Sequence, residues 1–205
     1  MTEPREIAPH AAEVVPGLWT WSISNSHIGG HTSTSHALLT REGCVLIDPV
    51  RLDEAAMAAL PRPTAILLTA RCHQRAAWRY RRQFRAEVWL PEDATGADEA
   101  PDHTYADGQT LPGGLRAFRT PGPEWPHYSF LYETDPGVVF CSDLVSSDAD
   151  GLHLIDPALH EDPTTTRASL ESLLDLRFGV LCLAHGAPVT DDPARALRDL
   201  LAREG

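Results

Sequence analysis

The sequence predicts an α+β fold in which two mixed β-sheets pack face to face with helices on their outer sides, an αββα sandwich. Two observations support this prediction. Short apolar runs of strand length recur along the chain, and helical stretches interrupt them in a definite order. Hairpins come first, then strand–helix–strand, then hairpins again, and finally helix, strand and helix. This order suits two packed sheets with helices outside.

The predicted strands are short runs rich in β-branched and aromatic residues. They span 18–23, 36–40, 44–48, 65–69, 87–90, 115–120, 128–133, 138–142 and 180–184. Two pairs of neighbours are separated by turn residues, Arg41-Glu42-Gly43 and Asp135-Pro136-Gly137. Because Pro fixes φ and Gly tolerates positive φ, both segments predict tight hairpins.

Four helices are predicted, over 53–60, about 73–85, 163–176 and 193–203. The last two follow Asp-Pro pairs, where the acid can cap the helix and the prolyl nitrogen needs no hydrogen bond in the first turn. In the last helix, Leu197, Leu200 and Leu201 form one apolar stripe that should cover a sheet. The segment 91–107 is expected to be an irregular surface connection.

The composition narrows the class of protein. At 205 residues we expect one domain over 1–205, and a formal charge of −12 argues against nucleic acid as a partner. The acidic start and the absence of a long apolar window predict a cytoplasmic protein with no membrane contact, and a homo-oligomer remains open. Four widely separated cysteines argue against a disulfide framework: three lie in apolar strand-like runs and should be buried, whereas Cys72 follows such a run, between Arg71 and His73, where a thiolate is favoured.

Six segments stand out, in this order: Val15-Pro16-Gly17-Leu18-Trp19, Cys44-Val45-Leu46-Ile47-Asp48-Pro49, Ala65-Ile66-Leu67-Leu68-Thr69, Thr120-Pro121-Gly122, Phe140-Cys141-Ser142-Asp143-Leu144 and Leu183-Ala184-His185-Gly186. In sequence and order they resemble the motifs of the metallo-β-lactamase-fold superfamily of metal-dependent hydrolases, and the resemblance covers nearly the whole chain. The resemblance implies that Asp143 and His185 occupy metal-ligand positions. It also implies that Asp48 matches the acid that lies behind those ligands, although Asp48 could equally be a strand-end cap.

Most other ligand positions of the family are changed. Where these hydrolases have H-x-H-x-D-H after the threonine, this chain has Ala70-Arg71-Cys72-His73-Gln74-Arg75, and Pro123 replaces a further histidine. His73 falls on a spacer position of that motif. Methyl, pyrrolidine and guanidinium groups donate no electron pair to zinc, so we expect no normal pair of metal ions.

One interpretation is that the fold has kept a pocket and lost its metals. Arg75, or Arg71, would then pair with Asp143 and replace the missing positive charge, unless both arginines project from the surface. Arg71, His73 and Arg75 gathered at the pocket mouth would favour a small anionic ligand, and a scaffold role is also compatible.

The alternative is one divalent metal, zinc, iron or manganese, in a nonstandard site. Asp143, His185, His73 and His127 are its candidate ligands, and Cys72 and the loop histidines His27 and His31 are candidate pocket residues. The expected reaction is hydrolysis of an ester, thioester, lactone or amide. A third possibility is nucleophilic chemistry at Cys72 with His73 beside it, which we rank last because sequence neighbours seldom face each other.

Overall fold

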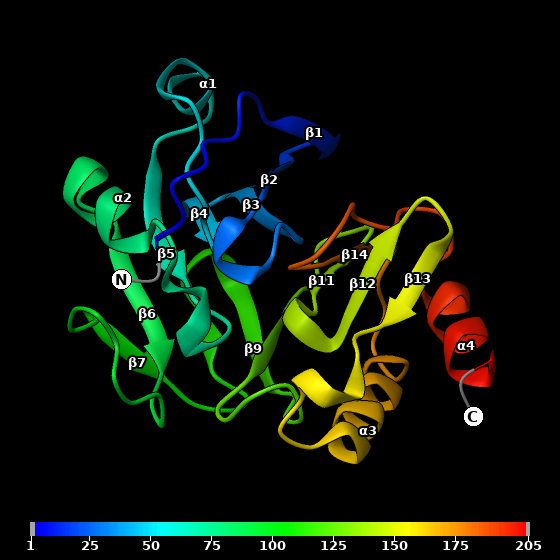
Figure 1. Ribbon diagram of the computed structural model, residues 1–205. Coiled ribbons are helices and arrows are strands. Elements are labelled where there is room, and N and C mark those ends of the chain that lie inside the picture. Colours follow the sequence, from blue (N-terminus) through cyan, green and yellow to red (C-terminus); the bar gives the residue numbers. More distant parts are fainter. Residues whose placement is uncertain (1–2, 204–205) are drawn as a thin grey trace.

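The computed structural model describes residues 3–203 and contains two sheets with helices on their outer sides (Figure 1). The first sheet has the order β1-β2-β3-β4-β5-β6-β7. Its strands are β1 (Ala12–Val15), β2 (Leu18–Ser24), β3 (Thr32–Thr40), β4 (Gly43–Ile47), β5 (Pro63–Leu67), β6 (Glu87–Pro91) and β7 (His103–Tyr105). The strands from β1 to β4 pair antiparallel, and those from β4 to β7 pair parallel.

The second sheet has the order β14-β11-β10-β9-β8. Its strands are β8 (Thr110–Leu111), β9 (Leu115–Arg119), β10 (Tyr128–Tyr132), β11 (Val138–Phe140) and β14 (Val180–Cys182). Only β11 and β14 pair in parallel. A separate hairpin, β12 (Val145–Asp148) with β13 (Gly151–Leu154), lies near the C-terminal helix (Figure 1).

The helices α1 (Glu54–Ala59) and α2 (Ala77–Phe84) lie on the side of the first sheet, and α3 (Pro163–Leu173) and α4 (Pro193–Arg203) on the side of the second (Figure 1). None of the helices within 3–203 has the length and hydropathy needed to cross a bilayer. Short 3₁₀ turns are η1 (Ser26–Ile28), η2 (Arg71–Gln74), η3 (Pro112–Gly114), η4 (Ser142–Leu144) and η5 (Pro157–Leu159).

The alternation of side chains along the strands explains this layering. Val45 and Ile47 of β4 pack between the sheets against residues such as Phe130, whereas Leu46, between them in sequence, packs outward with Trp78 of α2. A third apolar layer joins the outer face of the second sheet to α3 and α4. Because successive strand residues face opposite sides, each sheet carries two apolar faces and needs cover on both. The predicted αββα sandwich is confirmed.

The structure corrects several predicted boundaries. The helix expected over 73–85 is divided, because η2 ends at Gln74 and Arg75 has φ 37°, so α2 begins only at Ala77. A right-handed helix cannot continue through positive φ. The irregular connection expected over 91–107 contains β7, and the sequence did not predict β1, β8 or the β12–β13 hairpin.

Candidate functional site

The candidate site lies where four strand ends meet. Asp48 follows β4, Thr69 lies just beyond β5, Asp143 lies in η4 after β11, and His185 lies beyond β14. Backbone bonds tie these segments together: Thr34 N–H donates to Ala184 O (2.7 Å), and Tyr128 N–H donates to Thr69 O (3.0 Å). The carboxyl ends of parallel strands lie at the same edge of a sheet. Because the two sheets pack face to face, the ends of β4 and β5 lie close to the ends of β11 and β14.

Asp48 is the most deeply held acid of the site. Its side chain is 4% exposed and accepts hydrogen bonds from Thr69 N–H (2.9 Å) and Thr69 Oγ1 (2.5 Å). Burial alone would raise its pKa, but His73, Arg75 and the Thr69 hydroxyl outweigh burial and hold the pKa below 3.8. Asp48 therefore stays a carboxylate in the interior.

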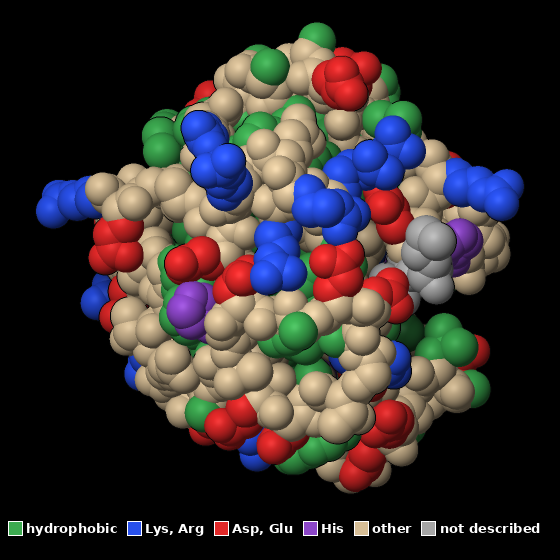
Figure 2. All heavy atoms as spheres, turned by 90° about the vertical axis from the view of Figure 1, so that its left-hand side faces the viewer, with side chains coloured by type: hydrophobic (Ala, Val, Ile, Leu, Met, Phe, Trp, Pro, Cys, Tyr) green, Lys and Arg blue, Asp and Glu red, His purple; other side chains and the backbone are tan. Residues whose placement is uncertain are grey.

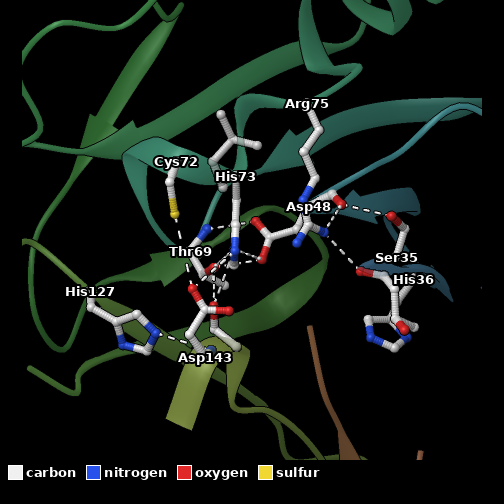
Figure 3. Close-up of polar contacts among 12 residues, drawn as sticks. Ser35, His36, Asp48, Thr69, Cys72, His73, Arg75, His127 and Asp143 are labelled. Carbon is white, nitrogen blue, oxygen red and sulfur yellow. Dashed lines mark hydrogen bonds and ion pairs between the residues drawn. The ribbon is translucent and has the colours of Figure 1, made fainter. Parts of the chain in front are cut away.

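His73 lies between two carboxylates (Figure 3). Its Nδ1 atom is 2.9 Å from Asp48 Oδ2, and its Nε2 atom is 3.1 Å from Asp143 Oδ2. Burial alone would lower the pKa of His73, but the neighbouring acids, Asp143 first, raise it well above 6.5. The same pairing holds the pKa of Asp143 well below 3.8, although burial of Asp143 acts in the opposite direction. An imidazolium thus neutralises charge at Asp143, one of the positions where the sequence resemblance implies a metal ligand.

His185 approaches the other oxygen of Asp143. Its Nε2 atom is 3.0 Å from Asp143 Oδ1, and its Nδ1–H donates to Thr32 O (2.6 Å). A histidine whose Nδ1–H is held by an oxygen acceptor presents the Nε2 lone pair in its neutral form, which is how metal-binding histidines are commonly oriented. Asp48 holds Nδ1 of His73 in the same way. Both imidazoles therefore direct Nε2 at the Asp143 carboxylate.

His127 has a different role from the one expected. Its Nδ1–H donates to Thr120 O (2.7 Å), but its Nε2 atom accepts the backbone N–H of Asp143 (3.3 Å). Burial lowers the pKa of His127 to about 4, so the ring is neutral at pH 7. With both ring nitrogens engaged, His127 positions Asp143 and is not a direct candidate ligand.

Cys72 adds a sulfur donor to the site. Its Sγ atom is 4.0 Å from Asp143 Oδ2, and the donor atoms of Cys72, His73 and Asp143 all lie within 4.8 Å of one another. Cys72 is exposed, unlike the three other cysteines of the chain, which are buried and free. Carboxylate, imidazole and thiolate are all ligands of zinc.

The two arginines do not take the predicted positions. Arg75 is 4% exposed and its Nη1 donates to Thr34 O (2.9 Å) and to Asp48 O (3.1 Å), while Arg71 lies at the surface 3.9 Å from Glu124 Oε2. Within residues 3–203, no ion pair joins either arginine to Asp143. The predicted arginine–Asp143 pair is therefore wrong, because His73 holds that place. Arg71, His73 and Arg75 do not form an anion-binding cluster at a mouth.

Other candidates fall outside the cluster. The Gln74 side chain turns to Trp78 Nε1 and Asp98 N–H, with Oε1 at 3.0 and 2.6 Å from them. His27 and His31 are exposed around η1, and no bond in the described part of the chain connects their side chains to Asp143. The loop adjoins the site only through Thr32, whose carbonyl holds His185.

The sequence analysis missed the hydroxyl groups that support His73. Ser142 Oγ is 2.7 Å from Thr69 Oγ1 and 3.2 Å from His73 Nδ1. Ser142 has φ 53° and Asp48 has φ 47°, conformations that cost non-glycine residues free energy and recur at functional sites. The signal in the sequence was that Thr69 and Ser142 both lie in segments that resemble the family's motifs.

A small cavity lies behind the candidate ligands. A buried cavity of about 10 Å³, bordered by His36, Asp48, Thr69 and Ser142, has room for about one water molecule. The larger hollow, about 340 Å³, lies elsewhere, beside Arg81, Arg82 and Arg85. Acidic side chains alternate with the basic ones on that face (Figure 2), where Arg81 and Arg82 pair with Asp102 and Glu99. The hollow is therefore a surface of compensated charge.

No family model matches the chain, and no curated protein matches it in sequence. Solved structures do match in fold. A DIM-1 metallo-β-lactamase exposed to ceftazidime superimposes with TM-score 0.71 at 12% identity over 97% of this chain and 99% of that one. A metallo-β-lactamase from Pontibacter korlensis gives TM-score 0.71 at 18% identity over 94% and 98%. TTHA1623 in a di-iron-bound form gives 0.62 at 25% identity over 77% and 89%.

The chain therefore has the metallo-β-lactamase fold, the fold of metal-dependent hydrolases. At these identities the likeness is one of fold, and function must be argued from the site itself.

Proposed function

We propose that this chain is a hydrolase-like protein whose centre holds one divalent metal ion and not two. The observation that carries the proposal is the orientation of His73 and His185. Both have Nδ1 held by an oxygen acceptor, and both direct Nε2 at a separate oxygen of Asp143, at 3.1 and 3.0 Å. The two imidazoles and the Asp143 carboxylate make three donors, which is the ligand number of a catalytic metal site.

The donor set does not fit a metal pair. Ala70 and Pro123 carry no donor, the Gln74 oxygen is engaged by Trp78 and Asp98, and the Arg75 guanidinium is fixed on two backbone carbonyls. A guanidinium stays protonated and opposes a second dication. One ion fits this donor set.

The surrounding residues would orient the ligands. Asp48 and Thr32 fix the two imidazole rings, and His127 fixes the backbone of Asp143. Bound at these donors, a divalent ion supplies Lewis-acid activation of water for hydrolysis of an ester, thioester, lactone or amide. His73 must first lose its Nε2 proton, because an imidazolium has no lone pair to donate. Metal and proton therefore compete for the same nitrogen.

The decisive experiment is metal stoichiometry. The full chain, stripped with chelator, would be titrated separately with zinc, iron(II) and manganese, and bound metal counted by elemental analysis. We expect about one ion per chain, and a loss of that ion in Asp143→Asn and His185→Gln. Asp148→Asn, an exposed acid that also pairs with a histidine, is the matched control and should bind normally.

Two stoichiometric ions would contradict the single-site proposal. No stoichiometric binding of any of the three metals would favour the second candidate, a metal-free protein with a binding or scaffold role. The observation behind that candidate is the His73 bridge itself, because one imidazolium between Asp48 and Asp143 already neutralises part of their charge. An anionic ligand is less supported, since Arg75 is buried and committed to carbonyl groups.

A further inference from the structure

Cys72 and His73 are consecutive in sequence, and both approach the same carboxylate. Cys72 Sγ and His73 Nε2 lie 4.0 and 3.1 Å from Asp143 Oδ2 (Figure 3). Consecutive residues of a regular helix or strand point in clearly different directions. This convergence therefore requires a special local backbone.

The turn η2 supplies that backbone. His73 departs from helical geometry within η2, with φ −89° and ψ 15°, and the positive φ of Arg75 ends the turn. The first half of the turn is held by two contacts: Ala70 forms a bridge with His127, and Cys72 N–H donates to Glu124 Oε1 (3.2 Å). The fold thus fixes the thiol beside Asp143. Sequence neighbours were expected to point in different directions, but Cys72 and His73 both approach Asp143.

We propose that the Cys72 thiolate is a ligand of the metal centre, making it a cysteine–histidine–aspartate site selective for zinc over manganese. This inference rests on the single-metal function proposed above. Its basis is that one donor atom each of Cys72, His73 and Asp143 lies within 4.8 Å of the other two. A thiolate prefers soft or borderline ions such as zinc, whereas manganese prefers oxygen ligands. On binding, Sγ–H and His73 Nε2–H each release one proton to solvent.

Cobalt(II) provides a direct test, because cobalt–thiolate bonds give a charge-transfer band in the near ultraviolet that nitrogen and oxygen ligands do not. The metal-free full chain would be titrated with cobalt(II) and the spectrum recorded. We expect the band to saturate at about one equivalent in the wild type and to be absent in Cys72→Ser. That variant should also bind zinc at least about tenfold more weakly and show a smaller preference for zinc over manganese.

Cys44→Ala is the matched control, since Cys44 is buried in the core away from the site and its variant should keep the band. Circular dichroism of each variant establishes that it folds. As a second measurement, iodoacetamide should modify Cys72 in the metal-free wild type, and one equivalent of zinc should protect it.

The outcomes separate the two proposals. Stoichiometric cobalt or zinc binding without the band, or a band unchanged in Cys72→Ser, would overturn the thiolate ligand and leave the single-metal function standing. If none of the metals binds the folded wild type, the proposed function fails and the thiolate ligand fails with it.

Discussion

Asp48 Oδ2 lies 2.9 Å from His73 Nδ1, and both side chains are only 4% exposed. The two residues come from different segments, Asp48 from the end of β4 and His73 from η2. Burying either charge alone is unfavourable, so each depends on the other for its ionised state. This pair also fixes the direction of His73 Nε2, and with it the geometry at Asp143.

Replacing Asp48 with asparagine should destabilise the metal-free protein strongly. Asn can still accept the Thr69 N–H bond, but it leaves the buried His73 with Asp143 alone as an opposite charge and removes the charged partner of its Nδ1 atom. Removing one partner of a buried pair typically costs about 3 kcal/mol or more, so the free energy of unfolding should fall by about that amount. Urea unfolding of the chelator-treated protein would measure it.

Asp148→Asn again serves as the control, because Asp148 pairs with His153 at 2.7 Å but both side chains are exposed, at 62% and 42%. Its unfolding midpoint should stay close to that of the wild type. Equal effects of the two substitutions would contradict the view that burial makes the Asp48–His73 pair important.

The layered fold could be predicted because its signals are local. A short continuous apolar run, such as Val45, Leu46 and Ile47, suits a strand with both faces covered, and the turn residues mark the hairpins. Short edge strands such as β7, with three residues, carry too little pattern to be recognised. The break at Arg75 was also hidden, since positive φ in a non-glycine residue follows from tertiary contacts that local sequence does not reveal.

The site could be predicted only in part. The sequence motifs identified Asp143 and His185, and these residues do lie together at 3.0 Å. His73 was assigned to a spacer position, because matching letters to a motif does not show which way a nonhelical turn directs its side chains. Arg75 was expected at Asp143, but its guanidinium is held by the carbonyls of Thr34 and Asp48. The partners of Arg75 are set by which buried polar groups need a hydrogen bond in the folded structure, and local sequence does not show this.

Arg75 should prove to be a structural residue. Arg75→Met has a similar length but removes the guanidinium donor from the buried carbonyl of Thr34, whereas Asp48 O keeps its bond from Ser35 Oγ–H (2.7 Å). An unsatisfied buried acceptor costs about 1–3 kcal/mol, so we expect the free energy of unfolding to fall by about 2 kcal/mol or more. Chemical denaturation would measure this loss.

Arg75→Lys should recover part of the stability, because an ammonium can reach one carbonyl but lacks the planar fork of arginine. Arg79→Met, at an arginine whose side chain is 44% exposed beside Glu3, is the control and should have little effect. A wild-type stability for Arg75→Met would show that these buried bonds contribute nothing.

His36 should make the protein sensitive to acid. Its Nε2–H donates to Leu183 O (3.0 Å), its Nδ1 has no hydrogen-bond partner in the described structure, and the residue is 3% exposed. Burial is the main cause that lowers the pKa of His36 to about 4, from 6.5. Because the folded protein binds this proton more weakly than the unfolded chain, acid favours unfolding. The contribution of neutral His36 to the free energy of unfolding is complete above pH 6.5 and is lost as the pH falls through about 4.

At about 1.4 kcal/mol per pH unit, the interval between these pKa values corresponds to about 3 kcal/mol. His36→Gln keeps an N–H donor for Leu183 but cannot bind a proton. Its free energy of unfolding should therefore fall less steeply than that of the wild type between pH 6.5 and 4, as measured by urea titrations across this range. His103→Gln, at an exposed histidine, is the control, and its free energy of unfolding should depend on pH as that of the wild type does. The same pH dependence in His36→Gln would contradict the expectation.

Gly186 should be required for the position of His185. It has φ 114°, and a Cβ atom there would lie 2.2 Å from Ser147 O, far inside van der Waals contact. Ser147 N–H donates to His185 O (2.9 Å), so the strand that would be pushed away is the one that holds the backbone of His185. Gly186→Ala should therefore displace β12 and lower the free energy of unfolding by about 3 kcal/mol.

The displacement should also weaken metal binding, because the imidazole of His185 moves with its backbone relative to Asp143. Gly151→Ala separates the two effects: Gly151 has the same φ, 114°, but nothing lies within 4 Å of its Cβ position. It should show only the smaller cost of the backbone conformation and normal zinc affinity by calorimetry. If Gly186→Ala lost stability and kept full zinc affinity, His185 would not be a ligand, and the metal would depend on His73, Asp143 and Cys72 alone.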